Sequence, residues 1–305
     1  MSPARQPRRR TCAHMVVHEL LVETQPEYRA RRLEVEEQTR RSIDSGQALK
    51  VAAKQITLPV VVHVVHRTED ENISDAQVRS QIQVLNSDYG AKNTDKSKVP
   101  APFKSLFGNA KIKFELTSKD PKGNKTNGIT RTATTVREFG PDNAVKKKAK
   151  GGVNPWPTDR YLNIWVCTLG ESLLGYAQFP GGPAATDGVV ILNTAFGTQG
   201  TAAAPFNKGR TATHEVGHFL NLRHIWGDRN DCSGNDFLAD TPPARQANTG
   251  KPKFPHITCN NGPNGDMFMN YMDYVDDDAM FMFTLGQVAR MNAALAGPRK
   301  KLAGL

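Results

Sequence analysis

The sequence predicts an α+β fold. Apolar, β-branched runs that favour strands alternate with helical patterns between residues 55 and 220, and residues 225–280 are loop-rich before a final helical segment. The chain has 305 residues, which is long enough for one large domain or two small ones. Hydrophobic residues make up 38% of it, and no run approaches the ~20 apolar residues of a membrane span. We therefore expect a globular chain with no membrane partner.

Residues 1–54 differ in composition from the rest of the chain. They are rich in Arg and Glu and poor in Gly, and no strand pattern appears before Gln55. The stretch 27–43 predicts a charged, exposed helix. We therefore expect an N-terminal prosegment at 1–54 that is separate from the main domain at 55–305.

Four segments of the 55–305 domain predict strands. The first, residues 56–66, is enriched in Val as buried strands are. Its two histidines are three residues apart and point to opposite faces of a strand, so we assign them structural roles. The other strands are predicted at residues 112–116, 161–168 and 187–192. An amphipathic helix capped by Ser74 follows the first strand and ends near Tyr89.

The segment 214–224, HEVGHFLNLRH, predicts a metal centre. On a helix over 210–220, His214 and His218 share one face, so both Nε2 atoms can reach one zinc ion at about 2.0–2.1 Å. Glu215 projects beside the metal and suits a general base. His224 becomes the third ligand if the chain turns back after the helix.

Three neutral imidazoles leave one zinc position open, as catalytic sites do. One alternative is a chance pattern of histidines, which the third His at the six-residue offset disfavours. Another alternative is an inactive, zinc-stabilised binding module, which has no use for the carboxylate of Glu215. The sequence therefore predicts hydrolysis by a zinc-activated water.

Motifs downstream of the histidines extend the pattern. NYMDY stands at 270–274, DTP at 240–242, DD at 277–278 and FTLGQVARM at 283–291. Together with the zinc helix, they resemble the pappalysin group of the metzincin metalloproteases, whose motif HExxHxxGxxH is followed by a tight turn with a methionine. The resemblance covers about residues 11–297. It departs from the family at Asn221, where the motif has Gly, but Asn tolerates the positive φ that such a turn needs.

The resemblance implies a metzincin zincin fold and the activity of a zinc-dependent endopeptidase that acts on proteins or peptides. Its twisted, mostly parallel sheet and zinc-binding helix would form an N-terminal subdomain at 55–221. A loop-rich C-terminal subdomain at 222–305 would end in a helix, with Thr284 as its N-cap. The strand at 187–192 is expected to be the sheet edge beside the cleft, and the segment 175–193 to pair with an extended substrate, unless this is an ordinary edge strand.

The resemblance also assigns roles to three side chains after the zinc helix. Met272 would be a packing floor beneath the metal. Tyr274 would assist the oxyanion or act as a movable ligand, the alternative being a packed Tyr with a hydrogen-bonded hydroxyl. Asp278 resembles a buried acidic residue of the S1′ pocket, which would favour Arg or Lys after the scissile bond. The alternative is a solvated aspartate in the run 276–278.

A calcium site is implied by the same resemblance. Asp236, the carbonyl of Ala239, and Thr241 resemble a ligand set of pappalysin-like enzymes. Oxygen ligands in a loop suit Ca²⁺. The alternative is a polar loop that is capped by its own aspartate.

Three of the four cysteines are given structural roles. Cys232 and Cys259 resemble a disulfide pair of the family, and a link would hold a loop that has little core of its own; the alternative is two free thiols. A second bridge of the family is absent here, because the later position is Ala279. Cys167 is expected to be a buried core residue.

Cys12 is a candidate latency switch. It follows Arg8–Arg10, whose positive charges depress a thiol pKa. A thiolate in the open zinc position would keep the enzyme latent, as in some pappalysin-like precursors, and the alternative is a stray exposed thiol. Cleavage to release the prosegment is expected at its basic residues, which are Arg40, Arg41, Lys50 and Lys54.

The net charge of +10 raises the alternative of a nucleic-acid-associated protein. No basic patch interleaved with aromatic residues is visible, so we favour a solvated basic surface and expect no nucleic-acid partner. No signal peptide is recognisable near the N-terminus, since no apolar run of 7–15 residues follows the basic start. The resemblance nevertheless favours a secreted protein, and we expect a monomer.

Overall fold

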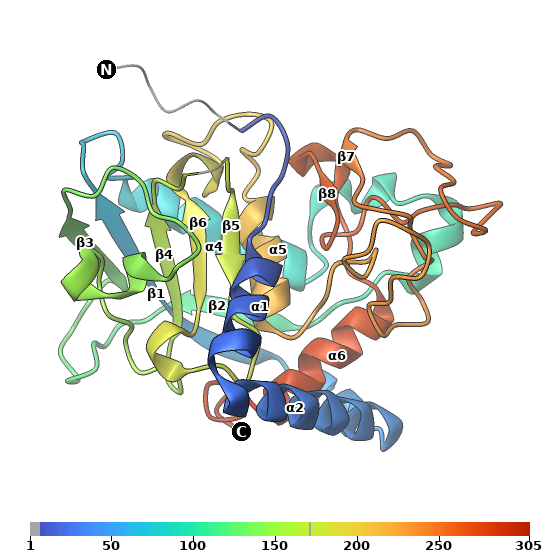
Figure 1. Ribbon diagram of the computed structural model, residues 1–305, viewed down its shortest axis with the longest axis horizontal. Helices are drawn as coiled ribbons and strands as arrows, with labels where there is room; N and C mark the ends of the chain where they lie inside the picture. The colour runs from blue at the N-terminus through green and yellow to red at the C-terminus, as the bar shows by residue number, and fades with distance from the viewer. Residues whose placement is uncertain (1–6, 171) are drawn as a thin grey trace.

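The computed structural model describes residues 7–170 and 172–305 and confirms the α+β class. Figure 1 shows a sheet on one side, loops on the other, and helices between and below them. The helices are α1 (His14–Thr24), α2 (Pro26–Asp44), α3 (Gln47–Ala52), α4 (Asp75–Tyr89), α5 (Arg210–Phe219) and α6 (Leu285–Ala296). The strands are β1 (Ile56–His66), β2 (Ile112–Leu116), β3 (Ile129–Ala133), β4 (Leu162–Cys167), β5 (Gly175–Ala177), β6 (Val189–Leu192), β7 (Thr249–Gly250) and β8 (Tyr274–Val275). Short 3-10 turns lie at Thr94–Lys98, Ala101–Leu106, Ala144–Lys146, Lys148–Lys150, Ala184–Thr186, Asn193–Ala195 and Asp277–Ala279.

The main sheet is mostly parallel, as predicted. Its order is β2-β1-β4-β6-β5, and β3 continues the β2 side by pairing with the second half of β1. Strands β1, β2, β3, β4 and β6 are parallel, and β5 alone runs antiparallel, against β6. Every residue of β4 and β6 is buried, which is typical of parallel strands covered on both faces.

The edge strand differs from the prediction. Residues 187–192 contain β6, which lies inside the sheet between β4 and β5. The edge beside the zinc helix is instead β5, a three-residue strand that hydrophobic patterning could not resolve. The sheet edge that was expected at 187–192 therefore lies at 175–177.

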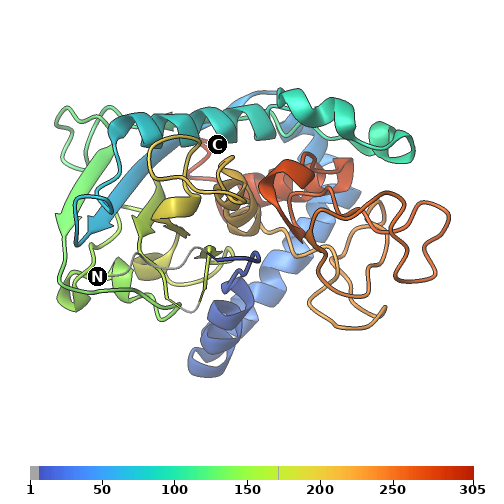
Figure 2. The same cartoon turned by 90° about the horizontal axis from the view of Figure 1, so that it is seen from above.

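Helices α4 and α5 pack together and against strands of the sheet, and Figure 2 shows α4 running along this side of the molecule. The predicted cap of α4 is confirmed, since the hydroxyl of Ser74 accepts from the backbone N–H of Gln77. The hydroxyl of Tyr89, at the end of α4, donates a hydrogen bond to Thr213 O in α5. These contacts connect α5, the helix that carries His214 and His218, to the main apolar core.

The N-terminal helices lie against residues 55–305 rather than apart from them. Helix α2 matches the predicted helix at 27–43, but one face is buried, and α2 and α3 both pack on α6. Tyr28, which is fully buried, belongs with α1 to a second apolar cluster that includes Trp165 of β4. The expectation of a wholly exposed helix was therefore wrong, because Tyr28 and Val35 are buried against the rest of the chain.

The C-terminal part, 222–305, is loop-rich as predicted and is held by apolar side chains of the main core, by buried polar contacts and by a disulfide. The disulfide Cys232–Cys259 closes one loop, which confirms the pairing. Buried Asp266 and Asp273 are joined by the amide of Asn248, which donates to both. Helix α6 begins with the predicted Thr284 cap in a full capping box.

Candidate metal centre and active site

Three histidine side chains converge at the C-terminal end of α5. His218 Nε2 lies 3.1 Å from His214 Nε2 and 3.0 Å from His224 Nε2. Two nitrogens bound to one tetrahedral zinc ion would be separated by about 3.3 Å, given bonds of about 2.0–2.1 Å. All three rings are at most 1% exposed. The donor set and its spacing fit zinc.

The other ring nitrogen of each histidine is engaged. His214 Nδ1 contacts Tyr271 O at 2.8 Å, His218 Nδ1 contacts Leu222 O at 2.8 Å, and His224 Nδ1 contacts Asp228 Oδ1 at 2.5 Å. Because each of these oxygens accepts, the Nδ1 atoms carry the protons and the Nε2 lone pairs face one another. Burial lowers the pKa of His214 and of His218 well below the usual value, which also favours neutral imidazoles.

The turn after α5 returns the third histidine to the site. Asn221 has φ = 75°, so the left-handed conformation expected at this position is confirmed. Its carbonyl accepts from Arg290 Nε at 2.7 Å. Its side-chain amide lies 3.3 Å from Thr39 Oγ1 in α2, so this residue also contacts the N-terminal segment.

Met272 lies under the helix that carries the ligands. A Cβ added to Gly217 would come within 2.5 Å of its sulfur, so the helix can approach the methionine only because residue 217 has no side chain. Met272 is fully buried. Its place agrees with a packing floor.

Cys12 lies at the mouth of the histidine cluster. Its Sγ and one Nε2 or Nδ1 of each of the three histidines fall within 4.8 Å of one another, which makes a possible four-ligand metal site. The backbone around it pairs with the sheet edge: Ala13 N donates to Gly175 O and Leu174 N donates to Thr11 O. The segment therefore occupies both the metal site and the edge of β5.

Glu215 faces the same point from α5. The thiol of Cys12 donates to Glu215 Oε2 at 3.3 Å. Burial raises the pKa of Glu215 to about 8. Burial, and next the charge of Glu215, raise the pKa of the Cys12 thiol well above its usual value. The prediction that Arg8–Arg10 lower the pKa of the Cys12 thiol was wrong. The thiol is buried beside a carboxylate, and Arg10 binds other groups.

Tyr274 touches both the ligands and the N-terminal segment. Its ring centre lies 4.9 Å from that of His224 and 5.7 Å from that of His214. Its hydroxyl donates to Cys12 O at 3.2 Å and accepts from Cys12 N at 3.3 Å. The hydroxyl is thus already directed to the place where Cys12 enters the site.

The guanidinium of Arg10 lies in a site lined with hydrogen-bond acceptors at the N-terminal end of α5. It donates to Asp277 Oδ1 at 2.5 Å, to Thr211 Oγ1 at 3.0 Å and to Val275 O at 3.2 Å. The guanidinium also lies 5.1 Å from the ring centre of Phe206. Arg10 is 3% exposed and Asp277 is fully buried, so the charges are neutralised inside the protein.

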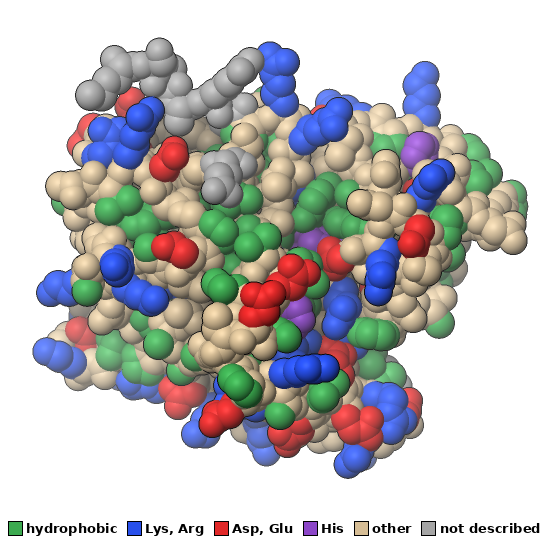
Figure 3. Space-filling model, in the orientation of Figure 1, with side chains coloured by type: hydrophobic (Ala, Val, Ile, Leu, Met, Phe, Trp, Pro, Cys, Tyr) green, Lys and Arg blue, Asp and Glu red, His purple; other side chains and the backbone are tan. Residues whose placement is uncertain are grey.

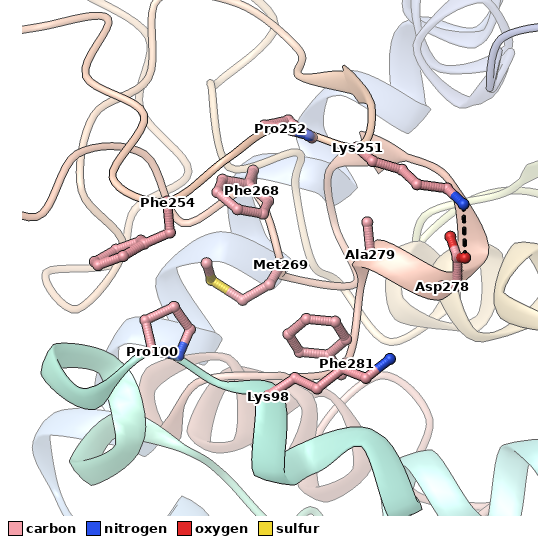
Figure 4. A pocket seen from close by; sticks show the side chains of 10 residues that line it. All are labelled: Lys98, Pro100, Lys251, Pro252, Phe254, Phe268, Met269, Asp278, Ala279 and Phe281. Atoms are coloured by element: carbon pink, nitrogen blue, oxygen red, sulfur yellow. Dashed lines mark hydrogen bonds and ion pairs between the residues drawn. The ribbon is translucent and has the colours of Figure 1, made fainter.

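Asp278 differs from its expected surroundings. Its side chain is 31% exposed and pairs with Lys251 at 2.7 Å, at the rim of a pocket of about 240 Å³ (Figure 4). The buried carboxylate that sequence reasoning assigned to Asp278 is that of its neighbour Asp277. Along a 3-10 turn, adjacent side chains point in different directions, and the sequence DDD gives no sign of which one turns inward.

The residues of the expected calcium site lie partly together. Thr241 Oγ1 is 2.9 and 2.8 Å from the two carboxylate oxygens of Asp236, and Leu238 N donates to the same carboxylate. Burial raises the pKa of Asp236 to about 7. Asp240, between them, instead caps α6 by accepting from Thr284 Oγ1 and Gly286 N.

Sequence reasoning missed several residues of the site. His14 stacks on His218 with ring centres 3.9 Å apart, and its Nδ1 contacts Ala177 O. Asp228 stands four residues after His224, a spacing that could have indicated it. Nothing local marks His14, Arg10 or Asp277, because their partners are distant in sequence. Cys167, by contrast, is a buried free thiol as predicted.

Comparisons with known proteins bear on this site. The peptidase family model described as pregnancy-associated plasma protein-A matches residues 146–296. An extracellular metalloprotease of Arthroderma otae is 32% identical over 246 residues, which cover 78% of this chain and 77% of that protein. This chain belongs to the pappalysin family. An extracellular metalloprotease of Pyricularia oryzae is 32% identical over 257 residues, covering 81% of this pappalysin and 78% of that protein.

Solved structures agree with the pappalysin assignment. A promirolysin variant of Tannerella forsythia is 48% identical, with a TM-score of 0.88, and covers 96% of this chain and 97% of its own. Mature mirolysin of the same organism, in complex with a cleaved peptide, is 52% identical, with a TM-score of 0.81, and covers 82% and 96%. This pappalysin is therefore a metzincin and a zinc-dependent metalloendopeptidase. An inactive binding module is not favoured.

The face of the molecule that Figure 3 shows does not favour the alternative of a basic, nucleic-acid-associated protein. On the face in Figure 3, Lys and Arg side chains are scattered among acidic ones rather than gathered in one patch. Among the described residues, no helix is both long and apolar enough to cross a membrane. The expected partners of this pappalysin are protein or peptide substrates.

Proposed function

We propose that this metalloendopeptidase is made as a latent precursor, and that its processed form cuts peptide bonds before Arg or Lys. Residues 1–54 would be the prosegment and residues 55–305 the enzyme, with subdomains at 55–221 and 222–305. The observation that carries the proposal is the simultaneous insertion of Arg10 and Cys12 into the cleft.

Latency would come from Cys12. Its thiol lies among the three histidines and donates to the carboxylate of Glu215, so it competes with water for both the metal and the base. The bridge between Cys12 and Gly175 also closes the β5 edge to an extended peptide. Release of the segment would free the metal position, the base and the edge in one step.

The lengths of the matched structures support the same boundary. Promirolysin aligns with 96% of this chain, whereas mature mirolysin aligns with 82%. The latter share corresponds to about 250 residues of 305, which is close to the length of 55–305. Arg40 and Arg41, with side chains 62% and 73% exposed, and the exposed Lys50 and Lys54 are open to cleavage.

In the processed enzyme, Glu215 would accept a proton from the attacking water and later deliver it to the leaving amine. His214, His218 and His224 would hold the zinc ion, which would supply a Lewis acid for the scissile carbonyl and the water. The hydroxyl of Tyr274, freed from Cys12, would donate a hydrogen bond to the oxyanion. Met272 would keep the helix with the ligands in place from below.

The preference for a basic residue is proposed from Arg10. Its site combines a buried carboxylate, a hydroxyl, a backbone carbonyl and an aromatic face, all of which suit a guanidinium. We therefore move the specificity role from Asp278 to Asp277. A planar guanidinium can use the whole set of acceptors, so Arg should be preferred to Lys.

Further parts of the proposal rest on the family. We propose a calcium ion at Asp236, Ala239 and Thr241, because two buried carboxylate oxygens and a hydroxyl converge there. We also propose secretion, because the curated relatives are named extracellular metalloproteases. A monomer remains our expectation.

The test is mass-spectrometric mapping of cleavage sites in a denatured protein mixture. Full-length wild type and Glu215→Ala would be processed with trypsin, inhibited and compared. We expect cuts only from wild type, mostly before Arg. In Asp277→Asn, kcat/KM for Arg substrates should fall about tenfold, whereas Asp278→Asn should stay within about twofold.

Cuts by wild type without a basic preference would remove Asp277 from the proposal but keep the peptidase. Equal losses in Asp277→Asn and Asp278→Asn would do the same. Because Asp277 also accepts backbone N–H groups of Lys208 and Arg210, zinc content and Tm of its variant must match wild type for the comparison to count.

A further inference from the structure

The surface that α2 covers carries two arginines of the enzyme. Arg290 forms an ion pair with Glu36 of α2, and its Nε donates to Asn221 O at 2.7 Å. The guanidinium carbon of Arg223 lies 4.7 Å from the ring centre of Phe237 and 5.9 Å from that of Phe179. Glu36 thus enters a basic, aromatic-lined surface that belongs to the enzyme.

The positive charges at this surface favour an acidic side chain at the position of Glu36. Burial alone would raise the pKa of Glu36, but the charges of Arg290 and Arg223 of the enzyme, together with that of Arg32 of α2, outweigh it and lower the pKa. Arg32 also forms an ion pair with Glu36 within α2. The pKa of Arg32 in α2 is lowered to about 10, with burial as the largest cause. The positive charges of Arg290 and Arg223 lower it further. Among the described residues, the buried Nε of Arg223 has no hydrogen-bond partner.

This surface adjoins the cleft on the side away from the Arg10 site. Thr211, which binds Arg10, is in the first turn of α5, whereas Arg223 follows its last turn and directly precedes His224. The ring centre of His218 is 6.2 Å from that of Phe179, which is 5.9 Å from Arg223, so the guanidinium is at most about 12 Å from His218. Roughly three or four extended residues cover that distance at ~3.3 Å each.

We propose that in the processed enzyme Arg223 and Arg290, flanked by Phe179 and Phe237, bind a glutamate side chain of the substrate, roughly three or four residues before the scissile bond. Glu36 holds that place in the precursor. The inference rests on the proposed function, because the surface is free only after α2 has left. Substrates would then be recognised by two opposite charges, an acidic one before the cut and a basic one after it.

The experiment uses peptides with Arg after the cut and a single Glu, Gln or Lys scanned over the positions two to five before it. The full chain is processed with trypsin and freed of the N-terminal fragment. For wild type, Glu at one position should raise kcat/KM about five- to tenfold over Gln, mainly through KM, and Lys should lower it. Arg223→Lys should keep the preference for Glu, and Arg223→Glu should reverse it to Lys.

Arg229 is exposed and lies six residues after Arg223, so it offers a matched charge change. Arg229→Glu should leave the preference for Glu intact, which separates a local contact from a general field. Arg223→Gln, with zinc content and Tm like wild type, replaces Arg223→Glu if the latter does not fold. It should abolish the difference between Glu and Gln without reversing it.

Binding supplies an independent readout. Labelled Glu and Gln peptides would be titrated into processed Glu215→Ala by fluorescence anisotropy, and the Glu peptide should bind about five- to tenfold more tightly. Equal binding and equal cleavage of Glu and Gln peptides would overturn the glutamate site while cuts before Arg kept the proposed function. Tighter binding of Glu peptides together with no preference for Arg would overturn the proposed specificity and leave the glutamate site standing.

Discussion

Residues 10–14 and helix α2 both lie against the enzyme, but they contact it in different ways. Residues 10–14 enter the site, where Arg10 and His14 are buried and Cys12 is half-buried, beside the candidate metal ligands and Asp277. Helix α2 lies on α6 and the end of α5, and Glu36 keeps a quarter of its side chain in contact with solvent. We propose that the contacts of residues 10–14 cause latency, whereas α2 contributes binding energy that holds the N-terminal segment in place.

The largest effect is expected from Cys12→Ala. Without the thiol, the metal position and Glu215 are open to water even while α2 stays docked. Full-length Cys12→Ala should therefore show roughly a hundredfold more activity on a fluorogenic peptide with Arg after the cut than the unprocessed wild type. Leu33→Ser, an exposed change on α2, is the control and should remain latent. If full-length Cys12→Ala were as inactive as the unprocessed wild type, a residue other than Cys12 would have to block the active site.

Arg10→Ala tests the second contact in the cleft. It leaves the buried carboxylate of Asp277 without its partner and should speed trypsin-driven activation of the precursor about tenfold. Arg9→Ala changes an exposed arginine next to it and should activate at the wild-type rate. The measurement is the appearance of peptidase activity with time at fixed trypsin. Similar rates for both variants would contradict the special role of Arg10.

A smaller effect is expected from the rim. Glu36→Gln removes a partly exposed ion pair with Arg290 and should speed activation only about two- to fivefold. Glu34→Gln, on the exposed side of the same helix, should match wild type. The processed enzymes should be indistinguishable, since residue 36 is no longer present. A Glu36 effect as large as that of Cys12→Ala would erase the distinction between the cleft and the rim.

The calcium site should affect stability without affecting latency. Burial raises the pKa of Asp236 to about 7, so the folded protein keeps a proton that the unfolded chain loses near pH 4, and stability is lost as pH rises from about 4 to 7. Calcium binds the carboxylate form and should offset that loss. Adding calcium should raise Tm by about 2–4 °C at pH 7 and less at pH 5, as followed by scanning calorimetry. Asp236→Asn should lose this response, and an equal response at both pH values would count against the site.

Much of the sheet and the zinc helix could be predicted because local patterns define them. The strands at 56–66 and 112–116 and the helix capped by Ser74 have the predicted bounds. β5 was missed because three residues are too few for a period, and its placement as the edge depends on pairing with β6. Its role therefore became visible only in the three-dimensional structure.

The site divides in the same way. The spacing of residues 214–224 predicts three metal ligands and a base. The motif also predicts the left-handed backbone conformation of Asn221. Arg10 and Asp277 are 267 residues apart, and Glu36 and Arg290 are 254 apart, so no spacing in the sequence pairs them. The choice of Asp277 over Asp278 depends on which side chain a 3-10 turn directs inward.

The central claim, that Cys12 closes the metal site of the precursor, is tested most directly by zinc X-ray absorption spectroscopy of the purified full-length protein. Three nitrogen ligands and one sulfur at about 2.3 Å are expected before processing, with the sulfur replaced by oxygen or nitrogen afterwards. Cys12→Ala should lack the sulfur from the start. A precursor spectrum without sulfur would contradict the account.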